Sequence, residues 1–309
     1  MIRRRPPAGR AASNVGETLL CEPNVSEGRD PARIERLCAA VTSTEGVRLL
    51  HRSADPDHHR MVLAYVGAPA AVIEATRRLA ARAFEEIDLG THRGAHPRGG
   101  ALDVVPFVAL GDLPGEAALA ACRSFGGWVG GRGVPVYYYE RAATRPERRA
   151  LPGVRADGFE GLSARMADPA WAPDEGPPRP HPSAGAVITG VRDPLVRFNV
   201  NLDTKDVRHA HEIAAGVRGA AGGLPGVRAL GFALPRRGLT QVSMNLTDHR
   251  ATPIAVAYAR VLAEARARGI AVAGTEIIGP VPRQALEGLD GRILDQLEEH
   301  QTLESREAP

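Results

Sequence analysis

The stretch that decides how this chain is arranged reads Asp88-Leu-Gly-Thr-His92-Arg-Gly-Ala-His96-Pro97-Arg98-Gly-Gly-Ala-Leu-Asp103. It places two histidines, two arginines and two carboxylates between glycines, a density that an ordinary surface loop does not need. A proton-transfer site for anionic substrates needs a titratable imidazole, fixed positive charge and a backbone that a ligand can approach. We predict that His96 is the catalytic residue, because an imidazole exchanges protons near neutral pH and Pro97 stiffens the backbone behind it.

Two other interpretations of these histidines compete with catalysis. The spacing from His92 to His96 matches a metal-binding pair on a helix, but Gly94, Pro97 and the pair Gly99-Gly100 disfavour a helix, and no glutamate lies in the interval. We therefore predict no metal. The histidines could also be ordinary exposed loop residues, which the density of titratable groups around them disfavours.

Composition predicts two layered subdomains. The 309-residue chain exceeds the usual size of a single core, and 43% of its residues are hydrophobic, which is enough to build two. Aromatic residues make up only 4%, so the cores consist mainly of Ala, Val, Leu and Ile, which suits helices packed closely on sheets.

Charge and cysteine content exclude several classes of protein. The net charge is only +3, and no basic run with interleaved aromatics appears, so we predict no nucleic-acid partner. Cys21, Cys38 and Cys122 are odd in number and far apart, which predicts neither a disulfide framework nor a zinc site and fits a reducing cytoplasm. No stretch has the apolar core of a signal peptide or the length to span a bilayer, so we predict no membrane association.

The elements on either side of the histidine loop connect it to a sheet. An amphipathic helix from Pro69 to Ile87 delivers the chain to the loop, and a strand over 101–107 leaves it. An earlier strand over 18–22 ends in a polar turn that contains Asn24 and Ser26. These two side chains either belong to the site or satisfy the turn backbone, and the sequence leaves both readings open.

The same order of elements occurs in both halves of the chain. Each half reads as strand, helix, hairpin, helix, strand, which is the split βαβ pattern. We therefore predict an α/β (α+β) fold with two split-βαβ subdomains, each a mixed sheet with helices on one face, and a polar cleft between them. The predicted strands are 18–22, 47–50, 58–66, 101–107 and 134–139 in the first half, and 186–191, 195–202, 226–234, 239–246 and 270–277 in the second.

The predicted domain limits follow from composition. Residues 1–16 form a flexible tail, 17–182 the N-terminal subdomain, 183–300 the C-terminal subdomain and 301–309 a frayed tail, with helical character from 282 to about 304. The proline-rich stretch 168–185 is either a stiff linker or a groove wall bearing Arg179, His181 and Ser183, and composition does not separate these readings.

Several residue strings together resemble the formiminotransferase family, in family order and over nearly everything from Leu19 to about Leu286. The strings are Cys21-Glu-Pro-Asn-Val-Ser-Glu-Gly28, Asp55-Pro-Asp-His58, His92-Arg-Gly-Ala-His-Pro-Arg98, 101–107, Val134-Pro-Val-Tyr137, Trp171-Ala-Pro-Asp174, Phe198-Asn-Val-Asn-Leu202 and Gln241-Val-Ser-Met-Asn-Leu246.

The resemblance implies a reaction and a site. The family passes a formimidoyl group from N-formimidoyl-L-glutamate to N5 of tetrahydrofolate, which acts as a co-substrate in a cleft between two subdomains. Its catalytic histidine falls on His96, and family members pair through this domain, which implies a homodimer. The family's folate segment falls on Gly176, Pro177, Pro178, Arg179, Pro180, His181, Pro182, Ser183, Ala184 and Gly185.

The implied substrates carry several carboxylates, so arginines and amides are expected around the cleft. A guanidinium grips a carboxylate through two parallel hydrogen bonds, and an asparagine reads an amide or a pterin edge. The candidate carboxylate binders are Arg60, Arg98 and Arg192, and the candidate amide or pterin readers are Asn24, Asn199, Asn201 and Asn245.

Three positions depart from the family pattern. Bacterial relatives usually read Asp-x-x-x-Asp-Pro-Asp-His-Asn-Arg, whereas this chain has His51 for the first aspartate and His59 for the asparagine, and Ser53 stands where mammalian members have an aspartate near the active site. A polar partner of the catalytic histidine is therefore missing or replaced. The alternatives are a related folate-dependent transferase with another formimidoyl or formyl donor, and a non-catalytic folate-binding protein.

Overall fold

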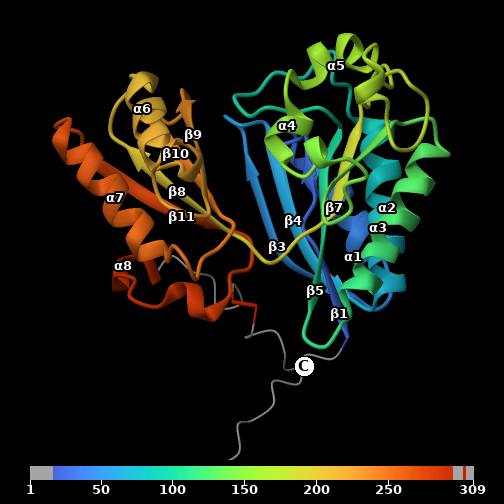
Figure 1. The fold of residues 1–309 in the computed structure, drawn as a ribbon, viewed down its shortest axis with the longest axis horizontal. Helices are drawn as coiled ribbons and strands as arrows, with labels where there is room; N and C mark the ends of the chain where they lie inside the picture. Colours follow the sequence, from blue (N-terminus) through green and yellow to red (C-terminus); the bar gives the residue numbers. More distant parts are fainter. Residues whose placement is uncertain (1–16, 295–301, 304–309) are drawn as a thin grey trace, which may run out of the picture.

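The computed structural model describes residues 17–294 and 302–303. They form two β-sheets that face each other, with helices on the outer sides of both (Figure 1). The predicted tail 1–16 lies outside the described residues, and so does most of the predicted tail 301–309. No helix of the described chain is long and apolar enough to cross a bilayer.

The first sheet has seven strands, and strand β4 joins the hairpin partner β3 to the centre of the sheet. The strands β1 to β4 and β5 pair antiparallel, whereas β5, β7 and β6 run parallel to one another. The strands are β1 (Thr18–Cys21), β2 (Asn24–Val25), β3 (Val47–Asp55), β4 (Arg60–Gly67), β5 (Leu102–Leu110), β6 (Val136–Glu140) and β7 (Val187–Val191).

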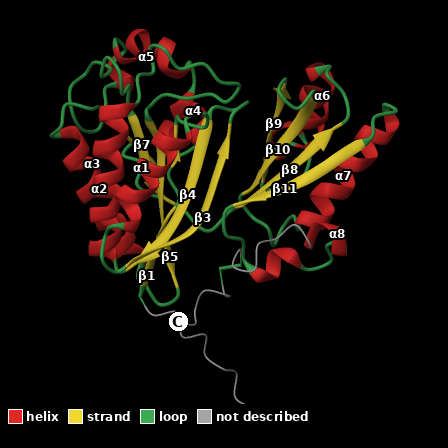
Figure 2. Cartoon of the chain, turned by 180° about the vertical axis from the view of Figure 1, so that it is seen from behind, coloured by secondary structure: helices red, strands yellow, loops and turns green. Residues whose placement is uncertain are grey.

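Helices α1 (Pro31–Thr42), α2 (Pro69–Glu86) and α3 (Gly115–Gly130) cover the outer face of this sheet (Figure 2). Helix α1 begins at Pro31, because the Asp30 carboxylate accepts hydrogen bonds from two backbone N–H groups of the first turn. The apolar stripe of α2 is buried in the core of the first half, so the helix ends at a fixed place beside the histidine loop.

The second sheet has the strand order β11-β8-β10-β9 and is antiparallel throughout. Helices α6 and α7 pack on its outer face over a separate core. The elements are β8 (Val196–Leu202), α6 (Val207–Val217), β9 (Val227–Leu234), β10 (Leu239–Leu246), α7 (Ile254–Ala267) and β11 (Val272–Ile278).

The predicted fold class is confirmed, with two differences in the sheets. Each half contains the split βαβ order, and the first half is extended by α3, β6 and β7. The second sheet is not mixed, because β10 lies between β8 and β9, and β8 lies between β10 and β11, so every hydrogen-bonded pair is antiparallel. In the first sheet, the crossovers through α3 and through α4 (Leu151–Arg155) and α5 (Gly158–Met166) bring β5, β6 and β7 into direct parallel pairs. The strand β7, which we placed in the second half, pairs with β5 and β6 of the first sheet, so the chain passes between the sheets after Val191 and not at 183.

Two short helices were not predicted. Helices α4 (Leu151–Arg155) and α5 (Gly158–Met166) pack on the inner face of the first sheet, which therefore has helices on both faces. Within the range of the predicted C-terminal helix, the described residues contain the 3-10 turn η4 (Arg283–Leu286) and α8 (Gly291–Leu294), and residues 295–301 and 304 lie outside them.

Candidate functional site

The histidine loop is fastened to the turn between β3 and β4. The backbone N–H of Ala95 donates to the carbonyl of Asp57 at 3.0 Å, and the ring Nε2 of His92 donates to the carbonyl of His59 at 2.8 Å. A side chain at position 94 would collide with the carbonyl of His58, so Gly94 permits this close approach. The predicted loop between a helix end and a sheet edge is thus confirmed, and residues 92–96 are not helical.

The far end of the loop is held by polar side chains on the first sheet. The Ser26 hydroxyl donates to the carbonyl of Gly100 at 2.7 Å, which answers the open question about this turn: Ser26 supports the loop backbone. The Asp103 carboxylate accepts from the N–H of Gly99 at 2.8 Å and from Arg155 at 2.7 Å. The loop therefore lies in one fixed conformation around His96.

The hydrogen bonds of His96 define its tautomer. Its Nδ1 lies 2.7 Å from the carbonyl oxygen of Pro97, which only accepts, so Nδ1 carries the proton. Its Nε2 lies 2.5 Å from NH1 of Arg60, which only donates, so Nε2 carries the lone pair. His96 is therefore neutral in this state, and its Nε2 is the atom that accepts a proton.

Electrostatics agree with a neutral ring. Burial, together with the positive charges of Arg60 and Arg155, holds the pKa of His96 well below its ordinary value. The sequence argument placed this pKa near neutrality, and burial together with the surrounding guanidiniums is the reason for the difference. Burial and the guanidiniums of Arg155 and Arg197 lower the pKa of Arg60 to about 9, so Arg60 stays charged at neutral pH.

A chain of hydrogen bonds from the second sheet fixes a neighbouring imidazole, His58. The Glu276 carboxylate only accepts, so the amide nitrogens of Asn201 and Gln241 must point toward it, at 3.0 Å and 3.2 Å. The Gln241 oxygen then faces His58 Nε2 at 3.1 Å and requires a proton there. Burial and Arg60 lower the pKa of His58, which agrees with a neutral ring whose unprotonated nitrogen is Nδ1.

The rings of His58, His96 and Phe232 pack together. His58 meets His96 edge-on at 5.8 Å between ring centroids, and Phe232 of β9 stacks on His96 at 5.6 Å. The first sheet thus supplies the histidines, and the second sheet supplies the surface that orients them.

The inner face of the second sheet is polar, as the alternation in its strands predicts. Asn199, Asn201 and Asn245 all lie on this face, because strand residues two positions apart point the same way and β8 pairs in register with β10. Glu276 of β11 pairs with Asn199 in register and lies within 3.4 Å of its amide nitrogen. Asn24, by contrast, is buried within the first sheet on β2.

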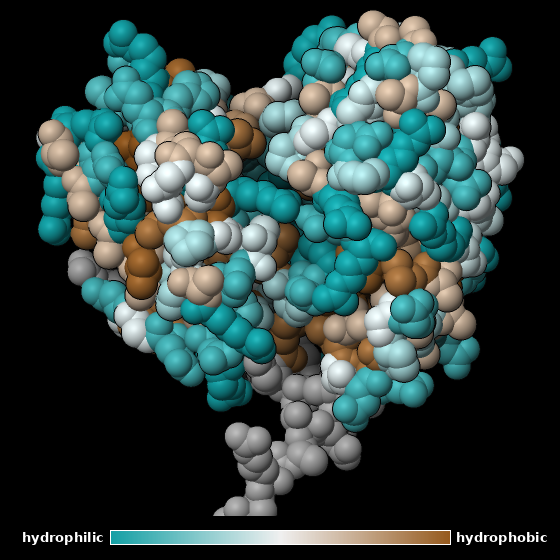
Figure 3. Space-filling model, viewed as in Figure 1, coloured by the Kyte–Doolittle hydropathy of each residue, from teal (hydrophilic) through white to brown (hydrophobic). Residues whose placement is uncertain are grey.

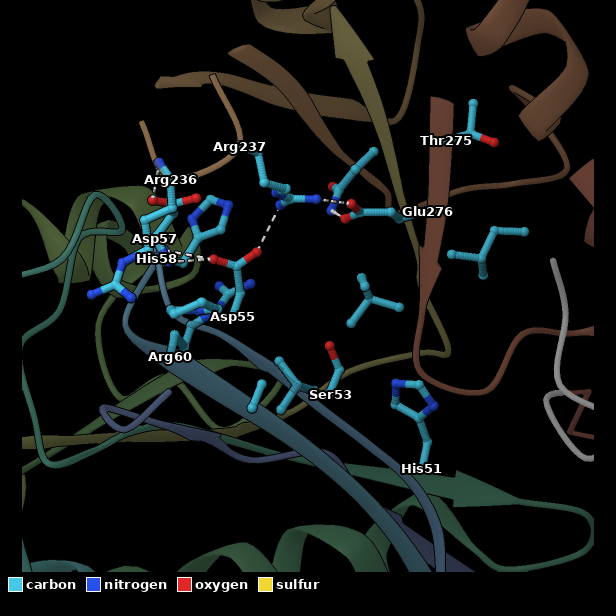
Figure 4. A pocket seen from close by; sticks show the side chains of 16 residues that line it. His51, Ser53, Asp55, Asp57, His58, Arg60, Arg236, Arg237, Thr275 and Glu276 are labelled. Carbon is cyan, nitrogen blue, oxygen red and sulfur yellow. Dashed lines mark hydrogen bonds and ion pairs between the residues drawn. The ribbon is translucent and has the colours of Figure 1, made fainter. Parts of the chain in front are cut away.

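A cavity of about 730 Å³ opens between the sheets (Figures 3 and 4). This volume lies within the usual range for small-molecule sites. Arg60 and Glu276 line it from opposite sheets, and Arg237 reaches across to Asp55 at 2.8 Å and to Glu276 at 2.6 Å. His51 and Ser53, two of the positions that differ from the family pattern, also line this cavity.

The candidate arginines differ in what they already bind. Arg98 holds the carboxylate of Glu160 at 2.7 Å, and Arg192 holds that of Glu22 at 2.6 Å. Among the residues that the structure describes, Arg60 has no carboxylate within ion-pair distance, and its recorded hydrogen bond is the one to His96. Arg60 is therefore the candidate best placed to receive a new carboxylate.

The segment 176–185 lies beside the histidine loop. The N–H of Leu89 donates to the carbonyl of Ser183 at 2.9 Å, and the N–H of Ala101 donates to the carbonyl of Ala184 at 2.9 Å. Gly176 and Gly185 both adopt positive φ angles, +80° and +67°, that shape the ends of the segment. It is thus a structured segment that packs against the loop within the first half, and the interpretation as a stiff linker between the halves is wrong.

Sequence reasoning did not select Glu276, Arg155 and Phe232 as site residues. Glu276 had a signal, since it is the one charged residue in the otherwise apolar or small strand Val272–Ile278. Arg155 gave no signal within its arginine-rich stretch, and Phe232 reads as an ordinary core residue. No group of three or more His, Cys, Asp and Glu side chains that could hold a metal occurs within residues 17–294 and 302–303.

Two family models match nearly all of the described chain. The model of the formiminotransferase domain, N-terminal subdomain, matches residues 18–192, and that of the formiminotransferase domain matches residues 197–296. A glutamate formimidoyltransferase of Streptococcus pyogenes serotype M1 is 40% identical over 88% of this chain and 91% of its own length. One from Thermoplasma acidophilum is 42% identical over 86% of this chain and 88% of its own length. A formimidoyltransferase-cyclodeaminase of Gallus gallus is 40% identical over 88% of this chain and 51% of its own length.

Proposed function

The chain belongs to the formiminotransferase family, and from this premise we propose that it transfers a formimidoyl group from N-formimidoyl-L-glutamate to N5 of tetrahydrofolate. The products are 5-formimidoyltetrahydrofolate and L-glutamate. The observation that carries the proposal is the neutral His96, whose proton-accepting Nε2 contacts Arg60, and Arg60 lines the cavity between the sheets.

The chemistry needs one proton carrier, and His96 meets that need. Tetrahydrofolate supplies N5 as the nucleophile, and a bond forms between N5 and the formimidoyl carbon while the bond from that carbon to the glutamate nitrogen breaks. His96 Nε2 takes the N5 proton and returns it to the departing glutamate nitrogen. A neutral imidazole held by the Pro97 carbonyl begins this cycle in the correct tautomer.

The other groups provide binding. Arg60 receives a carboxylate of the donor, and Asn199, Asn201 and Asn245 present amides from the facing sheet. The segment 176–185 forms the folate wall, which its hydrogen bonds to the histidine loop support. Arg98 and Arg192 act on this site through the carboxylates they hold, and the buried Asn24 supports the first sheet.

The wider setting follows from the same premise. We propose a homodimer that works in the cytoplasm, in histidine degradation and one-carbon metabolism, without a metal. The sedimentation behaviour of the purified protein checks the homodimer.

An assay with N-formimidoyl-L-glutamate and tetrahydrofolate tests the proposal. We expect turnover, and we expect His96→Ala to lower kcat by about 10²- to 10⁴-fold while tetrahydrofolate binding stays within a few-fold. Folate binding without turnover of this donor would reject the glutamate reaction. Unchanged turnover in His96→Ala would reject His96 as the proton carrier.

A second candidate is a related transferase with a different donor. The observation that favours it is that His51 and Ser53, which replace aspartates of the family pattern, both line the cavity. Turnover with an alternative formimidoyl or formyl donor that exceeds the turnover with formimidoylglutamate would establish it.

A further inference from the structure

The atom of His96 that must accept the substrate proton is already covered. Its Nδ1 donates to the Pro97 carbonyl, so Nε2 holds the only lone pair of the ring, and Arg60 donates into that lone pair at 2.5 Å. While this contact persists, no substrate N–H can reach the base. The free protein is therefore held in an inactive arrangement by one of its own cleft residues.

Arg60 is held less firmly than the arginines around it. Arg155 pairs with Asp103 at 2.7 Å, and Arg197 pairs with Glu22 at 2.8 Å, whereas the recorded partner of Arg60 is a neutral ring. A carboxylate adds the Coulombic attraction of an anion and can accept two parallel N–H bonds from the guanidinium, and the neutral ring offers neither. An incoming carboxylate thus competes well for Arg60.

The competitor can reach Arg60, since this side chain lines the cavity between the sheets. Its guanidinium also lies near Arg155 and Arg197, whose positive charges outweigh the nearby carboxylates of Asp103 and Asp55, so the net local field favours an anion. No carboxylate of the described chain satisfies Arg60 from this side.

We infer that Arg60 is a substrate-released cap on His96: a carboxylate of the donor draws the guanidinium away from Nε2 and so uncovers the base only when substrate is present. This rests on the proposed function, because it takes the donor to be a glutamate derivative. It adds that binding and activation of the base are coupled through one arginine. A proton is then not accepted from solvent or from folate alone before the donor arrives.

The charges that face His96 make the release measurable. They are Arg60 from β4, Arg155 from α4 and the neutral His58 from the turn before β4, while the second sheet offers the apolar Phe232. Moving Arg60 from Nε2 to a carboxylate removes a hydrogen bond to the neutral form and pairs the nearest cation with an anion. Both changes favour protonation of His96.

The test is a pH titration of the His96 ring nitrogens by NMR in the histidine-labelled full chain. N-acetyl-L-glutamate serves as the probe, because it has both carboxylates of the donor but no formimidoyl group to transfer. We expect saturating probe to raise the pKa of His96 by about one pH unit or more in the natural protein. In Arg60→Gln, the pKa should be raised already and should not respond to the probe.

A matched control separates the cap from a general loss of positive charge. Arg52 lies on the paired strand β3 and holds Glu35 of α1 at 2.5 Å, on a side chain that does not line the cavity. Arg52→Gln should titrate like the natural protein. The response of the natural protein does not depend on any variant folding.

The outcomes separate the cap from the reaction. Saturation by the probe with no change in the His96 titration overturns the cap, and turnover of formimidoylglutamate by the same preparation would leave the proposed function intact. Absence of that turnover would overturn the proposed function and the cap with it.

Discussion

Two arginine clusters lie between the sheets, one formed by Arg192 and Arg197 and the other by Arg60 and Arg155. They differ in whether each arginine already has a carboxylate partner. At one, Arg192 and Arg197 share the buried Glu22, at 2.6 Å and 2.8 Å, and tie the two sheets together. At the other, Arg60 donates to the neutral ring of His96. The first cluster is electrostatically complete, whereas Arg60 of the second has no carboxylate partner among the residues that the structure describes.

The comparison teaches that an arginine in a cleft is not by itself a binding residue. Burial opposes the ionisation of Glu22, but Arg197 and Arg192 outweigh it and lower its pKa, so the cluster is a stable joint. Arg60 has the same charge and no such partner among the described residues. Its free charge is what makes the second cluster suitable for a substrate.

The largest expected loss of stability follows from removing the carboxylate of Glu22 from the first cluster. Glu22→Gln leaves two buried guanidiniums without an anion, and we expect the free energy of unfolding to fall by about 3–5 kcal/mol in urea titrations at neutral pH. Because the folded pKa of Glu22 is lowered, its contribution exists above the unfolded value and is lost as the pH falls through the folded value.

In Glu22→Gln, the free energy of unfolding should therefore lack the loss that protonation of Glu22 causes in acid. Glu74→Gln on α2, whose partner Arg78 is about half exposed, is the control and should change stability little. Equal stability of Glu22→Gln and the natural protein would mean that the two clusters do not differ as described.

The second cluster depends on where the loop holds His96. In Gly94→Ala, the added methyl group meets the carbonyl of His58, so the loop must move. We expect a loss of about 1–3 kcal/mol in stability and a fall in kcat of up to about 10²-fold, measured by urea titration and steady-state kinetics. Gly127→Ala on α3, where a methyl group meets nothing within 4 Å, is the control. Full activity in Gly94→Ala would show that the position of His96 tolerates movement.

The smallest expected effect concerns the hydrogen-bond chain from the second sheet to His58, because its loss should lower stability alone. Gln241→Leu leaves the Nε2–H of the buried His58 without its acceptor and removes one of the donors to Glu276, which we expect to cost about 1–3 kcal/mol. The exposed Gln284→Leu serves as the control for the change of residue type. An unchanged urea midpoint in Gln241→Leu would remove the hydrogen-bond chain from the account.

Much of this arrangement follows from local sequence rules. Alternation places Asn199 and Asn201 on one face of β8, and the repeated order of elements gives the two split βαβ units. The glycines and Pro97 predict a loop at His96, and the structure has one there. These features depend on periods and turns that neighbouring residues determine.

The partners across the cleft do not follow from such rules. Arg60 contacts His96 because the loop packs on the turn before β4. Gln241 of β10 and Glu276 of β11 lie on the two strands that flank β8, and their side chains meet across it. The neighbours of His96 also shift its pKa away from neutrality, which depends on charges from α4 and β4 that only the folded chain brings together. The strand β7 was placed in the wrong sheet because its apolar run fits either core.

The most direct test of the account is the pH dependence of kcat/KM in the natural protein and in Arg60→Gln. Because Arg60 and burial hold the pKa of free His96 low, we predict that kcat/KM of the natural protein persists as the pH falls below 6.5, the ordinary histidine value. In Arg60→Gln, the acidic limb should move to higher pH. An acidic limb at or above 6.5 in the natural protein, unmoved by the substitution, would contradict the claim that Arg60 controls the base.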